Sequence, residues 1–155
     1  VFPTNRIAHF VEVSLYLFYL AQRVNIGTND ITEKYFGNQW FEHLMDNYKK
    51  ILETIYEKLD KPEVYVMAFY PANLHLPWQT EESTEWMKLR TPENIERCNK
   101  KLKEIAKSLG YNYLDCNIDL VDKNGEQKAE YAIDGVHMYA NGYLAVFDSL
   151  VHFLH

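Results

Sequence analysis

The sequence contains few cysteines, no basic cluster and no long apolar run, and each absence excludes a class of protein. Its two cysteines, Cys98 and Cys116, are too few for a disulfide framework and lack the paired spacing of a zinc site. We therefore expect two buried thiols and no bound metal. The net charge is −6 and the basic residues are scattered, whereas nucleic acids are bound by a clustered basic face. A nucleic-acid partner is not expected.

No uninterrupted apolar run approaches the roughly 20 residues that cross a bilayer, and the sequence has no internal repeat and no glycine-rich phosphate loop. A chain of 155 residues that is 47% hydrophobic is long enough to bury one core. We therefore expect a single domain over residues 1–155, with no membrane span. The compartment, cytoplasmic or secreted, stays open.

The apolar pattern predicts strands and helices in alternation. Strands are predicted at residues 23–26, 64–69 and 111–117, and helices at residues 38–59, at residues 91–109 and after Asn141 as an N-cap. Residues 72–90 and 119–132 have no usable periodicity and are predicted to be loops, the first long enough to form a lid. This order is typical of an α/β domain with a parallel sheet. Residues 11–19 alternate and favour a strand, whose place in the sheet stays open.

The same spacing predicts the inward face of each helix. The predicted inward residues are Phe41, Leu44, Met45, Tyr48, Ile51, Leu52, Ile55, Tyr56 and Leu59 in the first helix, Ile95, Cys98, Leu102, Ile105 and Leu109 in the second, and Leu144, Phe147, Leu150, Val151 and Leu154 in the last. Thr91 is predicted to cap the second helix, with Pro92 in its first position.

Two short segments carry candidate chemistry. Asp134 lies three residues before His137, so the carboxylate can reach one ring nitrogen, fix the tautomer and leave the other nitrogen outward as a base. Gly27 permits a tight turn at the end of a strand, where the Asn29 amide can donate to a developing oxyanion, and Asp30 is expected to bond the loop that positions Asn29. Together the segments predict acyl transfer. The alternatives are a buried ion pair or helix cap, and a turn amide that bonds its own backbone.

Both segments resemble sequence blocks of the SGNH hydrolases, also called GDSL-like lipases and acylhydrolases. Residues 27–30 match the family's Gly-x-Asn-Asp block, and residues 134–137 match its Asp-x-x-His block. The resemblance implies a three-layer flavodoxin-like α/β fold and hydrolysis of small carboxylic esters, such as lipid or acetyl-sugar esters, without a cofactor. It further implies that His137 is the general base, that Asp134 orients it, and that Asn29 donates to the oxyanion hole.

The family's Gly-Asp-Ser block, which supplies the nucleophile, is absent from the sequence. Ser14 is the only serine before Asn29, but it follows Glu-Val inside an extended run, and Ser83, Ser108 and Ser149 come in the wrong order. We therefore expect an N-terminally incomplete domain that lacks its first strand and the serine of its triad. Residues 11–19 or a second copy of the chain, by strand exchange or as a homo-oligomer, would then fill the vacated position. The rival interpretation is a non-catalytic SGNH-like fragment that serves as a binding or assembly module.

Aromatic residues in the predicted 72–90 loop are candidates for a substrate pocket. His75, Trp78 and Trp86 lie there, and they could line a pocket for an acyl chain or a sugar. The alternative is that these side chains pack onto the body of the domain.

Overall fold

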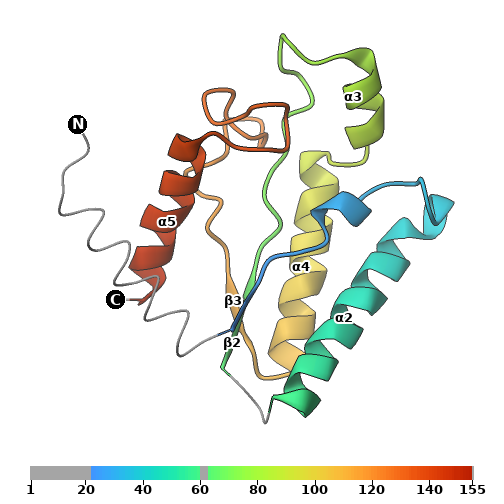
Figure 1. Cartoon of the computed structure of the whole chain (residues 1–155), viewed down its shortest axis with the longest axis vertical. Coiled ribbons are helices and arrows are strands. Elements are labelled where there is room, and N and C mark those ends of the chain that lie inside the picture. The colour runs from blue at the N-terminus through green and yellow to red at the C-terminus, as the bar shows by residue number, and fades with distance from the viewer. Residues whose placement is uncertain (1–21, 60–62, 155) are drawn as a thin grey trace.

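A computed structural model of the chain describes residues 22–59 and 63–154. The helices and strands are β1 (Gln22–Val24), the 3-10 helices η1 (Thr28–Asp30) and η2 (Gly37–Gln39), α2 (Trp40–Lys58), β2 (Val64–Met67), α3 (Glu81–Met87), α4 (Pro92–Ser108), β3 (Asn112–Leu114) and α5 (Ala140–Leu154) (Figure 1). The predicted strand at residues 11–19 lies outside the described part of the chain. No helix within that part is both long enough and apolar enough to span a membrane.

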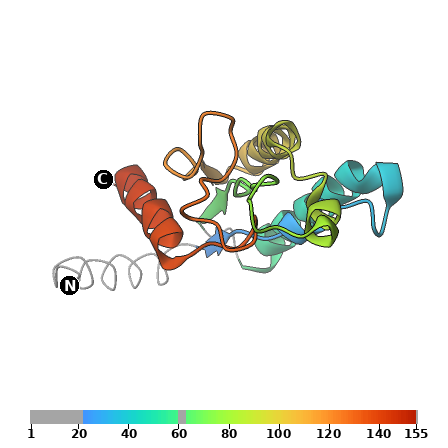
Figure 2. The ribbon, with the colours of Figure 1, turned by 90° about the horizontal axis from the view of Figure 1, so that it is seen from above.

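The described strands form one parallel sheet in the order β1-β2-β3. Val66 of the central strand pairs with Val24 on one side and with Tyr113 on the other. Helices α2 and α4 lie on one side of this sheet and α5 lies on the other (Figure 2). The three predicted strands are therefore present, each shorter than predicted, and the layered α/β architecture is confirmed.

Side chains that alternate along β2 build two separate cores. Val64 and Val66 belong to the core beneath α2 and α4, which we call the α2–α4 core. Met67 packs with Val146 and Leu150 of α5 on the opposite face, in what we call the α5 core. A nearly continuous apolar strand that is buried on both faces is the pattern expected for the centre of a parallel sheet.

Helix α2 buries a narrower stripe than its sequence predicts. Leu44, Met45, Tyr48 and Leu52 are buried as predicted, together with Trp40, which was not predicted. Ile51, Tyr56 and Leu59 are instead 40%, 37% and 53% exposed. The helix contacts the sheet and α4 along one side only, so apolar residues at the margins of the stripe remain in contact with solvent.

Helix α4 follows its prediction closely. The Thr91 side chain accepts a hydrogen bond from the Asn94 N–H (3.3 Å), and Pro92 occupies the first turn. The predicted inward residues Ile95, Cys98, Leu102 and Ile105 are buried.

Cys98 and Cys116 are both buried free thiols, as predicted, and burial raises their pKa values to about 12 and about 11. Both are therefore neutral apolar side chains at physiological pH.

Two helix predictions were wrong. Residues 72–90 are not entirely loop, because Thr80 and Ser83 form a capping box that begins α3. This helix escapes detection by periodicity because it is short and buries only Met87. Asn141 does not cap the last helix, since α5 already begins at Ala140. The Asn141 Nδ2 group instead donates to the main-chain oxygen of Glu130 (3.0 Å).

The inward face of α5 is also shifted. Leu144 is 36% exposed, whereas Val146 is buried together with the predicted Leu150. Phe147 and Val151 are half-buried. A helix that is apolar nearly all round gives little periodic signal, so its buried side is set by packing against the sheet.

The Thr91 cap predicts a measurable loss of stability. Thr91→Ala removes the acceptor for the Asn94 N–H and is expected to lower the free energy of unfolding by about 1 kcal/mol in urea titrations. Thr54→Ala is the matched control, because Thr54 is exposed in the middle of α2 and its hydroxyl bonds only the Lys50 oxygen. This control should be neutral or slightly stabilising; an equal loss in both variants would contradict a capping role.

Candidate active site

The segment that follows β2 is tied to the segment that leads into α5. The Asn73 N–H donates to the Gly135 oxygen (2.8 Å). The Gln79 Nε2 group donates to the main-chain oxygens of Asn73 (2.7 Å) and Asp134 (3.1 Å). In parallel α/β folds, sites form at the carboxyl edge of the strands. These bonds place residues 134–137 at that edge.

Asp134 and His137 form a hydrogen-bonded pair. The His137 Nδ1 atom lies 2.7 Å from Asp134 Oδ2. The second carboxylate oxygen of Asp134 accepts the N–H groups of Val136 (3.0 Å) and His137 (2.8 Å). The His137 side chain is 68% exposed, and its Nε2 atom has no hydrogen-bond partner among the described residues. The ring is therefore oriented by Asp134 and presents one nitrogen to solvent.

The same contacts keep Asp134 ionised. Burial opposes its negative charge, but the hydrogen bonds from the His137 ring and from the N–H groups of His137 and Val136 outweigh it, so the pKa of the carboxyl lies below its ordinary value. A carboxyl with a lowered pKa stabilises the folded chain at pH values above its unfolded pKa, and this contribution is lost as the pH falls through the folded pKa. Asp134 is thus an acceptor near neutral pH.

Gly135 allows the turn between these two residues to pack closely against its neighbours. Its φ of 91° lies in the left-handed region, and a Cβ at this position would collide with the Gln79 amide and with the main-chain oxygen of Asn73. A side chain here would strain the backbone and displace the contacts that hold the turn. The requirement for glycine is therefore both conformational and steric.

Asn29 lies on η1, directly after the β1 strand and a turn at Gly27. Gly27 has a φ of 92°, and a Cβ there would lie 3.2 Å from atoms of Leu44 and Phe69. The Asp30 N–H donates to the Gly27 oxygen (2.9 Å) and closes the turn. Asp30 thus bonds this loop through its main chain, while its exposed side chain has no hydrogen-bond partner among residues 22–59 and 63–154. Its role in positioning Asn29 stays a prediction.

Arg90 is a site residue that the sequence did not predict. Its side chain is fully buried, its NH2 nitrogen lies 3.5 Å from Asn29 Oδ1, and its guanidinium stacks 4.1 Å from the Trp86 ring centroid. Burial lowers the pKa of Arg90 to about 10, and the nearby negative charge of Asp134 opposes this change. Arg90 therefore contacts the Asn29 segment and interacts electrostatically with Asp134. A single arginine before the Thr91 cap has no pattern that would reveal this role.

The predicted pocket residues His75 and Trp78 do not contact the His137 ring. The His75 Nδ1 atom lies 2.8 and 2.9 Å from the two carboxylate oxygens of Glu126, which is almost fully buried. Trp78 donates its Nε1–H to the Ile133 oxygen (2.8 Å) and is 53% exposed. Trp78 thus lies beside the segment that carries Asp134, whereas His75 is engaged with a different loop.

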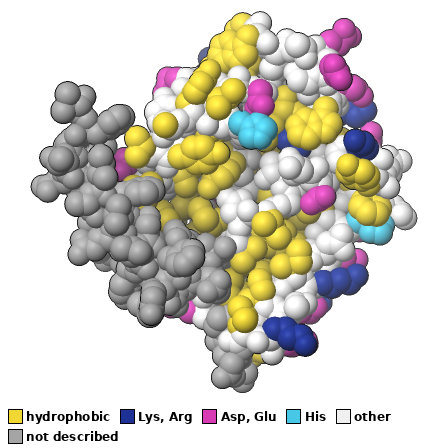
Figure 3. All heavy atoms as spheres, viewed as in Figure 1, with side chains coloured by type: hydrophobic (Ala, Val, Ile, Leu, Met, Phe, Trp, Pro, Cys, Tyr) yellow, Lys and Arg dark blue, Asp and Glu magenta, His cyan; other side chains and the backbone are white. Residues whose placement is uncertain are grey.

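Apolar side chains are exposed around this segment. The exposed set close to residues 134–137 in sequence or by contact comprises Trp78, Ile133, Tyr139 and Tyr143. Hydrophobic side chains gather around histidine and carboxylate groups on the face shown in Figure 3. Such a surface suits an apolar group next to a polar reaction centre.

None of the described serines contacts His137. Ser83 is occupied by the α3 cap with Thr80, Ser108 donates to the oxygen of Ile105 in its own helix (2.7 Å), and Ser149 is buried on α5. Ser14 lies outside the described residues. The structure therefore brings together Asp134 and His137, and places Arg90 beside Asn29, without a serine in contact with His137 among residues 22–59 and 63–154.

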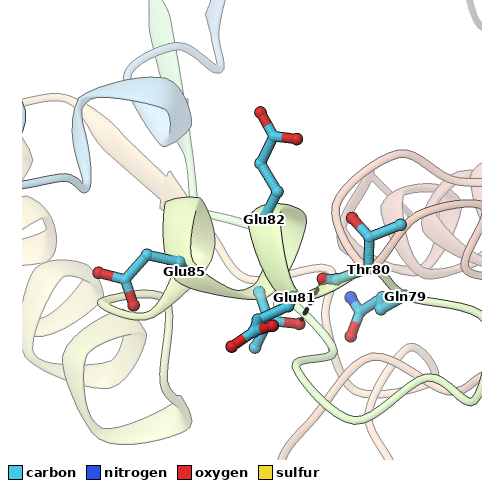
Figure 4. Close-up of a pocket in the computed structure, with 6 residues that line it drawn as sticks. Gln79, Thr80, Glu81, Glu82 and Glu85 are labelled. Carbon is cyan, nitrogen blue, oxygen red and sulfur yellow. Dashed lines mark hydrogen bonds between the residues drawn. The ribbon is translucent and has the colours of Figure 1, made fainter.

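An open cleft of about 810 Å³ lies beside α3. Its lining residues are Gln79, Thr80, Glu81, Glu82, Thr84 and Glu85. The Thr84 hydroxyl donates to the main-chain oxygen of Thr80 (3.0 Å), while the carboxylate of Glu82 points away from those of Glu81 and Glu85 (Figure 4).

Throughout the described ranges, no group of three or more His, Cys, Asp or Glu residues is arranged to hold a metal ion.

Comparison with known proteins agrees with this combination of fold and motifs. Residues 23–145 match the model of the GDSL-like Lipase/Acylhydrolase family, and the chain belongs to this family. No curated protein matches. The resemblance found in the sequence is therefore confirmed.

Solved structures show the same fold. The chain is 25% identical to a proposed platelet activating factor from Streptococcus pneumonia (TM-score 0.71, covering 87% of this chain and 59% of that one). It is 22% identical to a GDSL-like lipase from Bacteroides thetaiotaomicron (TM-score 0.64, 87% and 61%) and 18% identical to a carbohydrate acetylesterase from Sinorhizobium meliloti (TM-score 0.61, 86% and 59%). The chain thus spans about three fifths of the length of these structures, and the predicted SGNH-type α/β fold is confirmed.

The close packing of Gly135 gives a prediction for the turn. Gly135→Ala is expected to lower the free energy of unfolding by about 2 kcal/mol or more, because backbone strain and overpacking add. Gly110→Ala isolates the strain alone, since Gly110 has a φ of 72° but open space around its Cβ position. Urea titration of both variants checks this, and a Gly135→Ala loss no larger than that of Gly110→Ala would contradict the steric argument.

Proposed function

We propose that this protein hydrolyses carboxylic esters, with His137 as the general base, Asp134 as the group that orients it, and Asn29 as an oxyanion donor. The observation that carries the proposal is the 2.7 Å bond between His137 Nδ1 and Asp134, which leaves Nε2 exposed and without a partner in the described part of the chain. Membership of an acylhydrolase family supports it.

The proposed reaction is acyl transfer through a serine. The serine oxygen attacks the ester carbonyl while His137 Nε2 takes its proton, and the resulting oxyanion accepts a hydrogen bond from the Asn29 amide. His137 then gives the proton to the leaving alcohol. A water molecule, deprotonated by the same nitrogen, hydrolyses the acyl-enzyme. Asp134 stays ionised throughout and stabilises the imidazolium; the steps use no metal or organic cofactor.

The serine of this reaction is not identified among the 155 residues. The sequence has no Gly-Asp-Ser block, and the described serines are engaged or buried elsewhere. We therefore propose that the nucleophile is contributed from outside these residues, to the single domain of which residues 1–155 are part. Trp78, exposed beside the Asp134 segment, is proposed to contact the acyl or alcohol portion of a small ester, and His75 a more distant part.

Substitution of the pair tests the proposal. In the full protein that supplies the serine, with p-nitrophenyl acetate as substrate, His137→Ala is expected to lower kcat/KM by about 10³-fold or more, because the base is removed. Asp134→Asn is expected to lower it by a comparable factor, because the His137 ring loses its correct tautomer. His152→Ala is the matched control, since His152 is exposed on α5 and its ring lies within hydrogen-bond distance of the main-chain oxygen of Asp148. Unchanged activity in His137→Ala would refute the proposed base.

A second candidate function is a non-catalytic binding or assembly module, by strand exchange or as a homo-oligomer. The specific observation that favours it is the lack of any described serine in contact with His137. A fluorophosphonate probe separates the two functions, because it labels a serine only where a base activates it. In the full protein that supplies the serine, covalent labelling that disappears in His137→Ala supports the esterase, whereas no labelling together with no ester hydrolysis supports the module.

A further inference from the structure

Arg90 is an unusually costly residue for the interior of this fold. Its side chain is fully buried, yet its Nε and NH1 nitrogens have no hydrogen-bond partner among the residues that the structure describes. Buried charges are normally paired and hydrogen-bonded, and an uncompensated one destabilises the folded chain. A buried group without its full set of partners calls for an explanation, and a role in a neighbouring site is one. Its third nitrogen, NH2, lies near the Asn29 side chain. Its positive charge interacts with the negative charge of Asp134.

The contact between Arg90 and Asn29 determines which way the amide faces. The NH2 nitrogen of Arg90 lies 3.5 Å from Asn29 Oδ1, which is long for a hydrogen bond. A guanidinium, however, has donors and no acceptor. The opposite amide orientation would place two N–H groups against a positive charge. The Asn29 oxygen therefore faces Arg90, and its Nδ2 group is turned away from the protein interior.

Arg90 is itself held firmly. Its main-chain N–H donates to the Met87 oxygen (2.7 Å) at the end of α3, and the next residue, Thr91, caps α4. Its guanidinium plane lies 4.1 Å from the ring centroid of Trp86, a stacking arrangement that suits arginine better than lysine. Asn29, by contrast, is exposed, and its side chain has no other hydrogen-bond partner in the described ranges. Without Arg90, nothing described here would choose between the two amide orientations.

We propose that Arg90 is a positioning residue that orients the Asn29 amide, so that its N–H groups face the carbonyl of the ester. This inference rests on the proposed oxyanion role of Asn29. It assigns the buried cation to that amide and not to the substrate, because the guanidinium is inaccessible. The positive charge also favours the negative charge that develops on the other side of the amide during acyl transfer.

The first test measures the amide directly and needs no catalysis. The side-chain NH2 signals of Asn29 are identified in ¹H–¹⁵N spectra by their loss in Asn29→Asp. Arg90→Met is expected to shift these signals and bring them toward the positions of freely rotating amides. Arg97→Met is the matched control, because Arg97 also stacks on a ring, that of Phe41 (3.6 Å), but is half-exposed on α4. It should leave the Asn29 signals unchanged.

The outcome that overturns the proposal is a native spectrum of Arg90→Met in which the Asn29 signals have not moved. If Arg90→Met does not fold, Arg90→Lys is measured instead, since it keeps the charge but loses the planar stack. It is expected to shift the same two signals, and by less. Signals unmoved in a folded Arg90→Lys would then overturn the proposal.

The second test is a double-mutant cycle on ester hydrolysis. Arg90→Met is expected to lower kcat by about 10-fold to 100-fold with little change in KM, a smaller loss than the roughly 10²-fold to 10³-fold loss for removal of an oxyanion donor in Asn29→Ala. Because Arg90 acts through Asn29, the double variant should be no slower than Asn29→Ala alone. Additive losses would overturn the proposal. Absence of ester hydrolysis in the full protein that supplies the serine refutes the proposed function, while the NMR result still decides the role of Arg90.

Discussion

The candidate site depends on a small set of hydrogen bonds between the loop after the central strand and the turn at residues 134–137. Asn73 and Gln79 bind the main chain of this turn, and Gly135 permits the close approach. Neither partner belongs to a helix or a strand. The parallel sheet supplies a rigid edge, and the loops bonded across it supply the orientation. Asp134 then needs only a local bond to fix the His137 ring.

Much of the fold could be predicted because its signals are local. The apolar strand 64–67 and the Thr91-Pro92 helix start each carry their pattern within a few residues. The errors arose where packing decides the outcome. Helix α3 is held by a capping box with only Met87 buried, and α5 is too uniformly apolar to indicate its inward side. Burial of a helix margin depends on how much surface its neighbour covers, which a single chain segment does not encode.

The candidate site was predictable only in part, for a related reason. Asp134 and His137 are three residues apart, so their contact follows from spacing, and Gly27 and Asn29 share one turn. Arg90 is more than 40 residues from either segment and acquires its role solely from the fold. A buried guanidinium between a ring and an amide has no sequence signature, since the chain around it resembles an ordinary loop before a helix.

The two cores on opposite faces of the sheet divide the proposed chemistry between layers. The turn that carries Asn29 leads into α2 above one core, and the turn that carries His137 leads into α5 above the other. The distance between the Asn29 amide and the His137 ring thus depends on how the helices on each face pack against the sheet, which has three strands in the described chain. A volume change deep in either layer can tilt one helix relative to the other. A core substitution can therefore change the catalytic rate without an equal change in thermal stability.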